Sequence, residues 1–168
     1  IPALSDDLLM QVASVLRDEV TTTDELIPSG ETSSYRSNPL KLAEFALSRR
    51  DPDYVPRAKA TQALETARAD KTIGKSLEAA GTVMPELQAV LLALHLPESA
   101  LERMHIGSVI FANKPGDGSA REQAASCQRV LGGCANICYE FATKRYRSNC
   151  VNWGMLPFTL AEGDAFTC

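Results

Sequence analysis

The last third of the chain alternates between segments typical of strands and segments typical of helices. An apolar run at 108–112 leads into a glycine-rich turn, and a helix pattern begins at Ser119. A strand pattern follows at 134–139, then a further helix near 149–154 and a final strand pattern at 155–160. Strands that alternate with helices along a chain predict an α/β layer with crossover connections.

The preceding two thirds contain mostly helical patterns. Residues 8–25 are ambiguous, because their apolar positions fit helical spacing and strand alternation, while the β-branched run at its end favours an extended conformation. Helices are predicted at 39–50, 54–70 and 87–94, the last with a strongly amphipathic pattern. We expect one domain over 1–168 with a helical insertion at about 51–105.

Composition and charge exclude several classes of partner. The 168 residues carry 17 basic and 21 acidic side chains, a formal net charge of −4, with 45% hydrophobic and 23% charged residues. This is typical of a soluble domain, and the negative charge argues against a nucleic-acid or anionic-membrane surface. The triplet Arg145–Arg147 is interpreted as a solvated helix face. The longest apolar run, Ala89–Leu94, is far shorter than the ~20 residues of a membrane span. We therefore expect no nucleic-acid and no membrane partner.

Cysteine use predicts reduced thiols. The 5 cysteines are an odd number, no CxxC occurs, and His95 and His105 do not pair at ligand spacing. These features disfavour a disulfide framework or a metal site in this chain. Without a basic-then-apolar leader, the sequence predicts a cytoplasmic protein. Because the chain starts at Ile1 without methionine, we expect a segment of a longer polypeptide.

The segment GDGSARE, which starts at Gly116, carries the candidate chemistry. Its two glycines let the backbone turn sharply and approach a ligand closely. Ser119 would then stand at a helix N-terminus, where free amide donors and the helix dipole favour negative charge. Arg121 could bind a carboxylate in bidentate fashion. Together these groups predict a site for an anionic small molecule with a proton-transfer group in it.

A purely structural interpretation of the same segment stays open. Ser119 and Glu122 have the spacing of a capping box, in which each side chain accepts a hydrogen bond from the other's backbone amide. On that interpretation Ser119 only caps the start of a helix and takes part in no reaction.

Three separated segments resemble the aconitase family. GDGSAREQAASCQRVLGG, from Gly116, resembles the family signature GEGSSREHAALEPRxLGG. YRSNCVNWGMLP, from Tyr146, resembles HRTNxxNxGxLPL. Upstream, TTD from Thr22, followed at matching spacing by Gly30 and by the pair Tyr35–Arg36, resembles TTDHISxxGxxxxYRG.

This resemblance implies the C-terminal swivel domain of an aconitase-like hydratase or isomerase, a carbon–oxygen hydro-lyase. The implied fold is a swivelling β/β/α domain, a small mixed sheet or half-barrel with flanking helices. The implied substrate is a hydroxy di- or tricarboxylate. The implied [4Fe-4S] cluster acts as a Lewis acid and is bound by other domains of the same polypeptide or by a large subunit, with no metal ligand in this chain. The isolated domain is therefore expected to be inactive.

The resemblance also implies roles for individual residues. Ser119 falls on the catalytic serine, which removes a proton from the carbon next to a carboxylate. Arg121 and Arg36 fall on arginines that bind substrate carboxylates. Asp24 falls on an acidic residue near that pocket, and Ala120 falls on a substrate-contacting position where the family has a second serine.

Departures from the family pattern leave the substrate open. Ala120 removes one hydrogen bond to a carboxylate, and Gln123 stands where the family has histidine. These changes favour a related hydroxy-acid hydratase over aconitase proper. Two alternatives remain: a free-standing small subunit similar to that of isopropylmalate isomerases, and a non-catalytic interaction domain that keeps the turn as a capping box.

Overall fold

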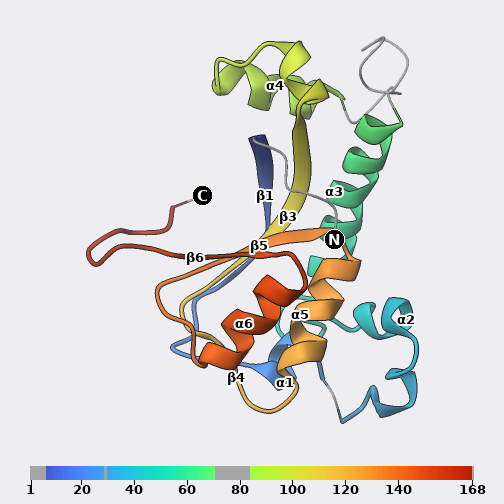
Figure 1. Ribbon diagram of the computed structural model, residues 1–168, viewed down its shortest axis with the longest axis vertical. Helices are drawn as coiled ribbons and strands as arrows, with labels where there is room; N and C mark the ends of the chain where they lie inside the picture. Colours follow the sequence, from blue (N-terminus) through green and yellow to red (C-terminus); the bar gives the residue numbers. More distant parts are fainter. Residues whose placement is uncertain (1–6, 29, 71–83, 168) are drawn as a thin grey trace.

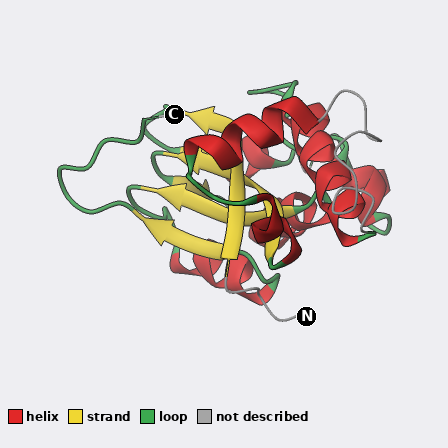
Figure 2. Cartoon of the chain, turned by 90° about the horizontal axis from the view of Figure 1, so that it is seen from above, coloured by secondary structure: helices red, strands yellow, loops and turns green. Residues whose placement is uncertain are grey.

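A parallel sheet lies at the centre of the computed structural model, which describes residues 7–28, 30–70 and 84–167. Its four strands follow the order β1 (Asp7–Leu16), β3 (Met104–Ala112), β5 (Gly133–Cys138) and β6 (Leu156–Thr159). Figure 2 shows these strands among the helices that flank them. A separate pair joins β2 (Thr21–Thr22) to β4 (Pro115–Asp117). The predicted α/β class with flanking helices is confirmed, and every strand pairing among the described residues is parallel where the sequence predicted a mixed sheet or half-barrel.

Residues 8–25, which fit either a helix or a strand by sequence, begin as strand β1, paired with β3. Strand β1 pairs along its length with β3, from Asp7 opposite Met104 to Leu16 opposite Ala112. The register shifts between Val12 and Ser14, which marks a bulge there. The residues that fix β1 as a strand therefore lie in a distant part of the sequence, which local periodicity does not reveal.

The helices follow the predicted order with different lengths. The helix predicted at 54–70 is present as α3, and the one predicted at 39–50 ends early, as α2. Two short helical turns, α1 and η1, lie between β2 and α2, where the sequence predicted no helix. Residues 71–83 of the predicted helical insertion lie outside the described residues. The bounds are α1 (Thr23–Leu26), η1 (Ser33–Tyr35), α2 (Pro39–Ala43), α3 (Tyr54–Ala69), α4 (Met84–Ala93), η2 (Glu98–Glu102), α5 (Arg121–Val130) and α6 (Lys144–Asn152).

The main core lies between one face of the sheet and α2, α3, α5 and α6 (Figure 1). Ile110 and Ala112 of β3 are buried in it. Neighbouring strand residues point to opposite faces, so Val109 lies on the other face, in a smaller cluster with Ala135 and the half-buried Leu156. The helices that form the candidate site therefore rest on a single face of the sheet.

Helix α4 buries less of its apolar surface than its sequence predicts. Leu87 and Leu91 are buried in a cluster with Ile106, whereas Val90 and Leu94 are exposed. Figure 1 places this helix at the far end of the molecule from α5 and α6. Among the described helices, none combines the length and the apolar character needed to cross a membrane.

A closed ring of three buried side chains ties α5, β5 and α6 together. The Gln128 side-chain amide donates to the Tyr146 hydroxyl (2.9 Å), which donates to the Asn136 side-chain carbonyl (3.1 Å). The Asn136 amide in turn donates to the Gln128 carbonyl (2.8 Å). The three residues are at most 2% exposed. Burial raises the pKa of Tyr146 well above its ordinary value, so the phenol stays neutral and keeps its proton for this ring.

Glycine is required where β4 leads into α5, because Gly116 has a φ of 97° and lies against the Tyr146 ring. A Cβ at this position would come within 2.3 Å of the ring carbons. We predict that Gly116→Ala lowers the free energy of unfolding by more than the roughly 1–2 kcal/mol typical of left-handed backbone strain alone. Urea unfolding followed by circular dichroism measures the change.

Gly163 is the matched control, since its φ is 92° and a Cβ there would meet nothing within 4 Å. Gly163→Ala should show the backbone term without the steric term. Equal losses in the two variants would mean that the contact with Tyr146 does not constrain the turn.

The four described cysteines are buried free thiols, and their ionisation links stability to pH. Burial raises the pKa of Cys134 to about 11 and that of Cys138 to about 12. In the unfolded chain a thiol ionises near pH 8.5. The unfolded state therefore loses these protons first, so their contribution to stability is complete below about pH 8.5 and is lost as pH rises towards 11–12.

We predict that the free energy of unfolding falls between pH 8 and pH 10, by up to about 1.4 kcal/mol per pH unit for each such thiol. Urea titrations at several pH values measure this slope. Cys138→Ala removes one titrating group and should flatten the slope, even if its stability at pH 7 is lower. A slope that the variant leaves unchanged would contradict this origin.

Candidate active site

The turn between β4 and α5 is built on close backbone contacts. Gly118 has a φ of 121°, and a Cβ on it would lie 2.3 Å from the Thr23 hydroxyl oxygen. The TTD motif that starts at Thr22 thus packs directly against the glycine turn. On the other side, the Thr143 hydroxyl donates to the Gly116 carbonyl (3.1 Å) and accepts from the Tyr146 amide (3.2 Å), which caps α6. The turn is therefore held between the start of α1 and the start of α6.

Ser119 is exposed at the end of this turn and does not cap the helix. The N-cap of α5 is Ala120, which has no side-chain hydrogen bond, and the helix begins at Arg121. The Ser119 hydroxyl has no hydrogen bond to any described residue. The capping box proposed for Ser119 and Glu122 is thus wrong, because the helix starts one residue later than that pattern requires.

The side chain of Asn149, in α6, contacts the backbone of the first turn of α5. With its side-chain amide oriented to satisfy both neighbours, Asn149 accepts a hydrogen bond from the Glu122 amide (3.0 Å) and donates to the Arg145 carbonyl (3.2 Å). One of the orphan amides of a helix start is satisfied in this way. The contact also fixes the distance between α5 and α6 at the site.

An open hollow of about 370 Å³ lies between the two helices. The start of α5 contributes Ser119, Arg121, Glu122 and Gln123. Helix α6 contributes Arg145, Ser148 and Asn149. The hydroxyl predicted to be the base and one of the two predicted arginines therefore share one site. Arg145, interpreted from the sequence as part of a solvated face, is exposed and also lines this hollow, which the sequence did not predict.

The charges around the hollow favour an anionic ligand. The guanidinium groups of Arg121 and Arg145 have no ion-pair partner among the residues 7–28, 30–70 and 84–167, and the carboxylate of Glu122 is exposed. The N-terminus of α5 adds the positive end of its dipole. A carboxylate bound here would find charged donors and unpaired backbone amides together.

The other predicted binding residues do not line this hollow. Asp24, in α1, forms an ion pair with Arg49. Arg36 is exposed at the end of η1, a turn that packs on α2, which packs on α5 in turn. The Thr22 and Glu25 side chains form a capping box on α1. The roles of Arg36 and Asp24 stay predictions, as does that of the buried Ala120.

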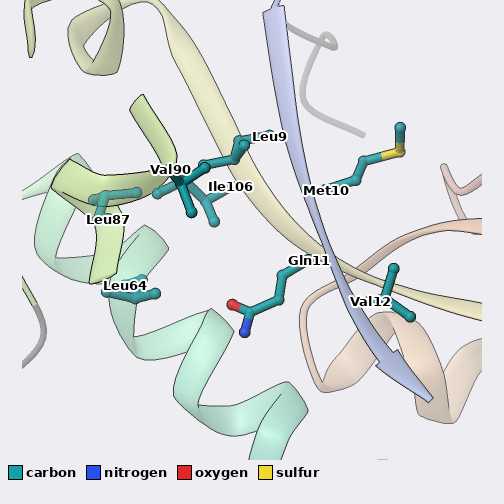
Figure 3. A pocket seen from close by; sticks show the side chains of 8 residues that line it. All are labelled: Leu9, Met10, Gln11, Val12, Leu64, Leu87, Val90 and Ile106. Atoms are coloured by element: carbon teal, nitrogen blue, oxygen red, sulfur yellow. The ribbon is translucent and has the colours of Figure 1, made fainter. Parts of the chain in front are cut away.

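Other hollows have different chemistry. One of about 300 Å³ lies between β1, α3 and α4, and Figure 3 shows Leu64, Leu87 and Val90 gathered in it with Gln11. Its described lining has no ionisable side chain. Another, of about 500 Å³, contains Glu65, which pairs with Arg68 at 2.7 Å and accepts from the Ile106 amide at 2.8 Å. Neither places an uncommitted hydroxyl beside arginines.

The described residues do not fit an iron–sulfur cluster. The thiols of Cys127, Cys134, Cys138 and Cys150 are buried, and burial raises the pKa of each, to between about 11 and about 12. A cluster ligand must be a thiolate, which a raised pKa disfavours. No group of three potential metal ligands occurs within the described ranges. Cys168 lies outside the described residues.

A known protein family matches the part of the chain that holds this hollow. The family described as the aconitase C-terminal domain matches residues 93–163. An aconitate hydratase A from Bradyrhizobium diazoefficiens is 43% identical over 60 residues, which make up 35% of this chain and 6% of that protein. The match thus spans a small part of that relative. The family match covers residues 93–163, which hold β3, the glycine turn, α5 and α6.

Proposed function

We propose that this chain is the C-terminal swivel domain of an aconitase-like hydratase or isomerase acting on a hydroxy di- or tricarboxylate. One observation carries the proposal: Ser119 and Arg121 line the same open hollow at the start of α5. The family match covers this segment, and the related protein from Bradyrhizobium is named an aconitate hydratase. Aconitate is therefore the first substrate to test.

Arg121 and Ser119 have different roles in the deprotonation of the substrate. Arg121 binds a substrate carboxylate in bidentate geometry and so positions the neighbouring carbon. Ser119, as its alkoxide, takes a proton from that carbon. The C–H electron pair becomes the C=C bond as the hydroxyl group on the adjacent carbon departs. Hydration is the reverse, with the Ser119 hydroxyl returning the proton to carbon.

The surroundings of Ser119 support an alkoxide there. A serine hydroxyl is a very weak acid, so its anion needs nearby positive charge. The N-terminus of α5 and the guanidinium of Arg121 provide that charge. Because the Ser119 hydroxyl has no hydrogen bond to a described residue, it is free to face the substrate.

Departure of the hydroxyl group requires a part of the enzyme outside these residues. The described cysteines do not fit a cluster, so we place a [4Fe-4S] cluster in other domains of the same polypeptide or in a large subunit. Those domains would also close the hollow, which is open in this chain. Arg36 would bind a further carboxylate from its exposed position on η1, and Asp24 would act beside it while paired with Arg49.

The alternative of a non-catalytic interaction domain loses the support that it drew from the turn. A non-catalytic interaction domain was proposed because Ser119 and Glu122 have capping-box spacing. The helix instead begins at Arg121, and Asn149 accepts from the Glu122 amide. Capping therefore does not account for Ser119.

We predict that Ser119→Ala lowers kcat about 10²- to 10⁴-fold with little change in KM, because it removes the base and leaves carboxylate binding intact. The complete enzyme, containing this chain and its cluster-bearing domains, is assayed with cis-aconitate by the ultraviolet absorbance of the conjugated double bond. Parallel assays use citrate and 3-isopropylmalate, which separate the substrate classes.

Ser99→Ala is the control, since this exposed serine lies on η2, outside the hollow. It should leave kcat unchanged. Full turnover by the Ser119→Ala enzyme on the substrate used by the unaltered enzyme would refute the catalytic assignment.

A further inference from the structure

Arg145 is not among the described arginines whose charge is taken up by an ion pair. Arg49, Arg50, Arg57 and Arg68 each form an ion pair with an acidic side chain. Arg145 is exposed, lines the hollow opposite Arg121, and has no ion-pair partner within the described ranges. An arginine at a site wall without a carboxylate partner is available to bind an anion.

The backbone that carries Arg145 is firmly held. Its carbonyl accepts from the Asn149 side chain, which also contacts the start of α5. The preceding turn is capped by Thr143, and the next residue, Tyr146, belongs to the buried ring. The guanidinium of Arg145 therefore projects from a fixed point on the wall, which lowers the entropy lost when it binds a ligand.

We propose that Arg145 binds a second carboxylate of the substrate, separate from the one held by Arg121. This inference rests on the proposed function and extends it to a residue of α6. Two guanidinium groups on different helices match a ligand with two separated carboxylates. The carboxylate of Glu122, beside Arg121 on the α5 side of the hollow, repels an anion. An anionic ligand therefore gains from contact with both arginines.

Arg147 provides a matched comparison. It lies on the same helix, is exposed, and does not line the hollow. Arg145→Gln and Arg147→Gln remove the same charge from nearly the same place. A difference between them therefore reports direct contact with the ligand and not the overall charge of α6.

The probe is tricarballylate, a saturated tricarboxylate, tested as a competitive inhibitor of the complete enzyme. We expect Arg145→Gln to raise its inhibition constant about 10- to 100-fold, the range of a lost charge-assisted contact. Arg147→Gln should change it less than about 3-fold, where only screened charge acts. Arg145→Lys should fall between, because it keeps the charge and loses bidentate geometry. The thermal midpoint should be equal in all variants, since these side chains are exposed.

The outcomes separate this inference from the proposed function. An inhibition constant unchanged by Arg145→Gln, or raised equally by Arg147→Gln, overturns the role of Arg145 while the Ser119→Ala result still stands. A fall in kcat without a change in the inhibition constant also overturns it, because a binding residue must alter binding. Full activity in the Ser119→Ala enzyme would instead remove the proposed function itself.

Discussion

The arrangement of the site depends on the buried hydrogen-bond ring of Gln128, Asn136 and Tyr146. Each member donates once within the ring and accepts once, so the three side chains satisfy one another away from water. Loss of one partner would leave buried polar groups unpaired, at a cost of roughly 1–3 kcal/mol. Because the ring joins α5, β5 and α6, it sets the position of both walls of the hollow at once.

Tyr146 also links the ring to the glycine turn. The phenol side chain of Tyr146 fills the space beside Gly116. Thr143, which caps the helix that carries Tyr146, donates its hydroxyl to the carbonyl of the same glycine. A change in the core is thus transmitted to the backbone just before Ser119. The shape of the segment that carries Ser119 therefore depends on side chains that do not line the hollow.

Some of this could be predicted from sequence, and the reasons for the rest are physical. Helix α3 and the strand-helix alternation of the last third have strong local patterns, so their prediction succeeded. Strand β1 was ambiguous because its identity comes from pairing with β3. The capping box failed because α5 begins at Arg121, one residue later than the pattern requires, and Asn149 of another helix accepts from the Glu122 amide. Arg145, Ser148 and Asn149 share one helix face at i, i+3 and i+4 spacing, a signal that was available but pointed to no partner.

The openness of the hollow affects how long a substrate can stay. Its walls are fixed by the ring, the turn and Asn149, so this domain has little means of folding around a ligand by itself. We expect a ligand that is contacted from one side only to dissociate faster than a ligand that is enclosed. In the enzyme proposed above, the residence time of a bound acid would then depend on how long the domain opposite the hollow stays in place.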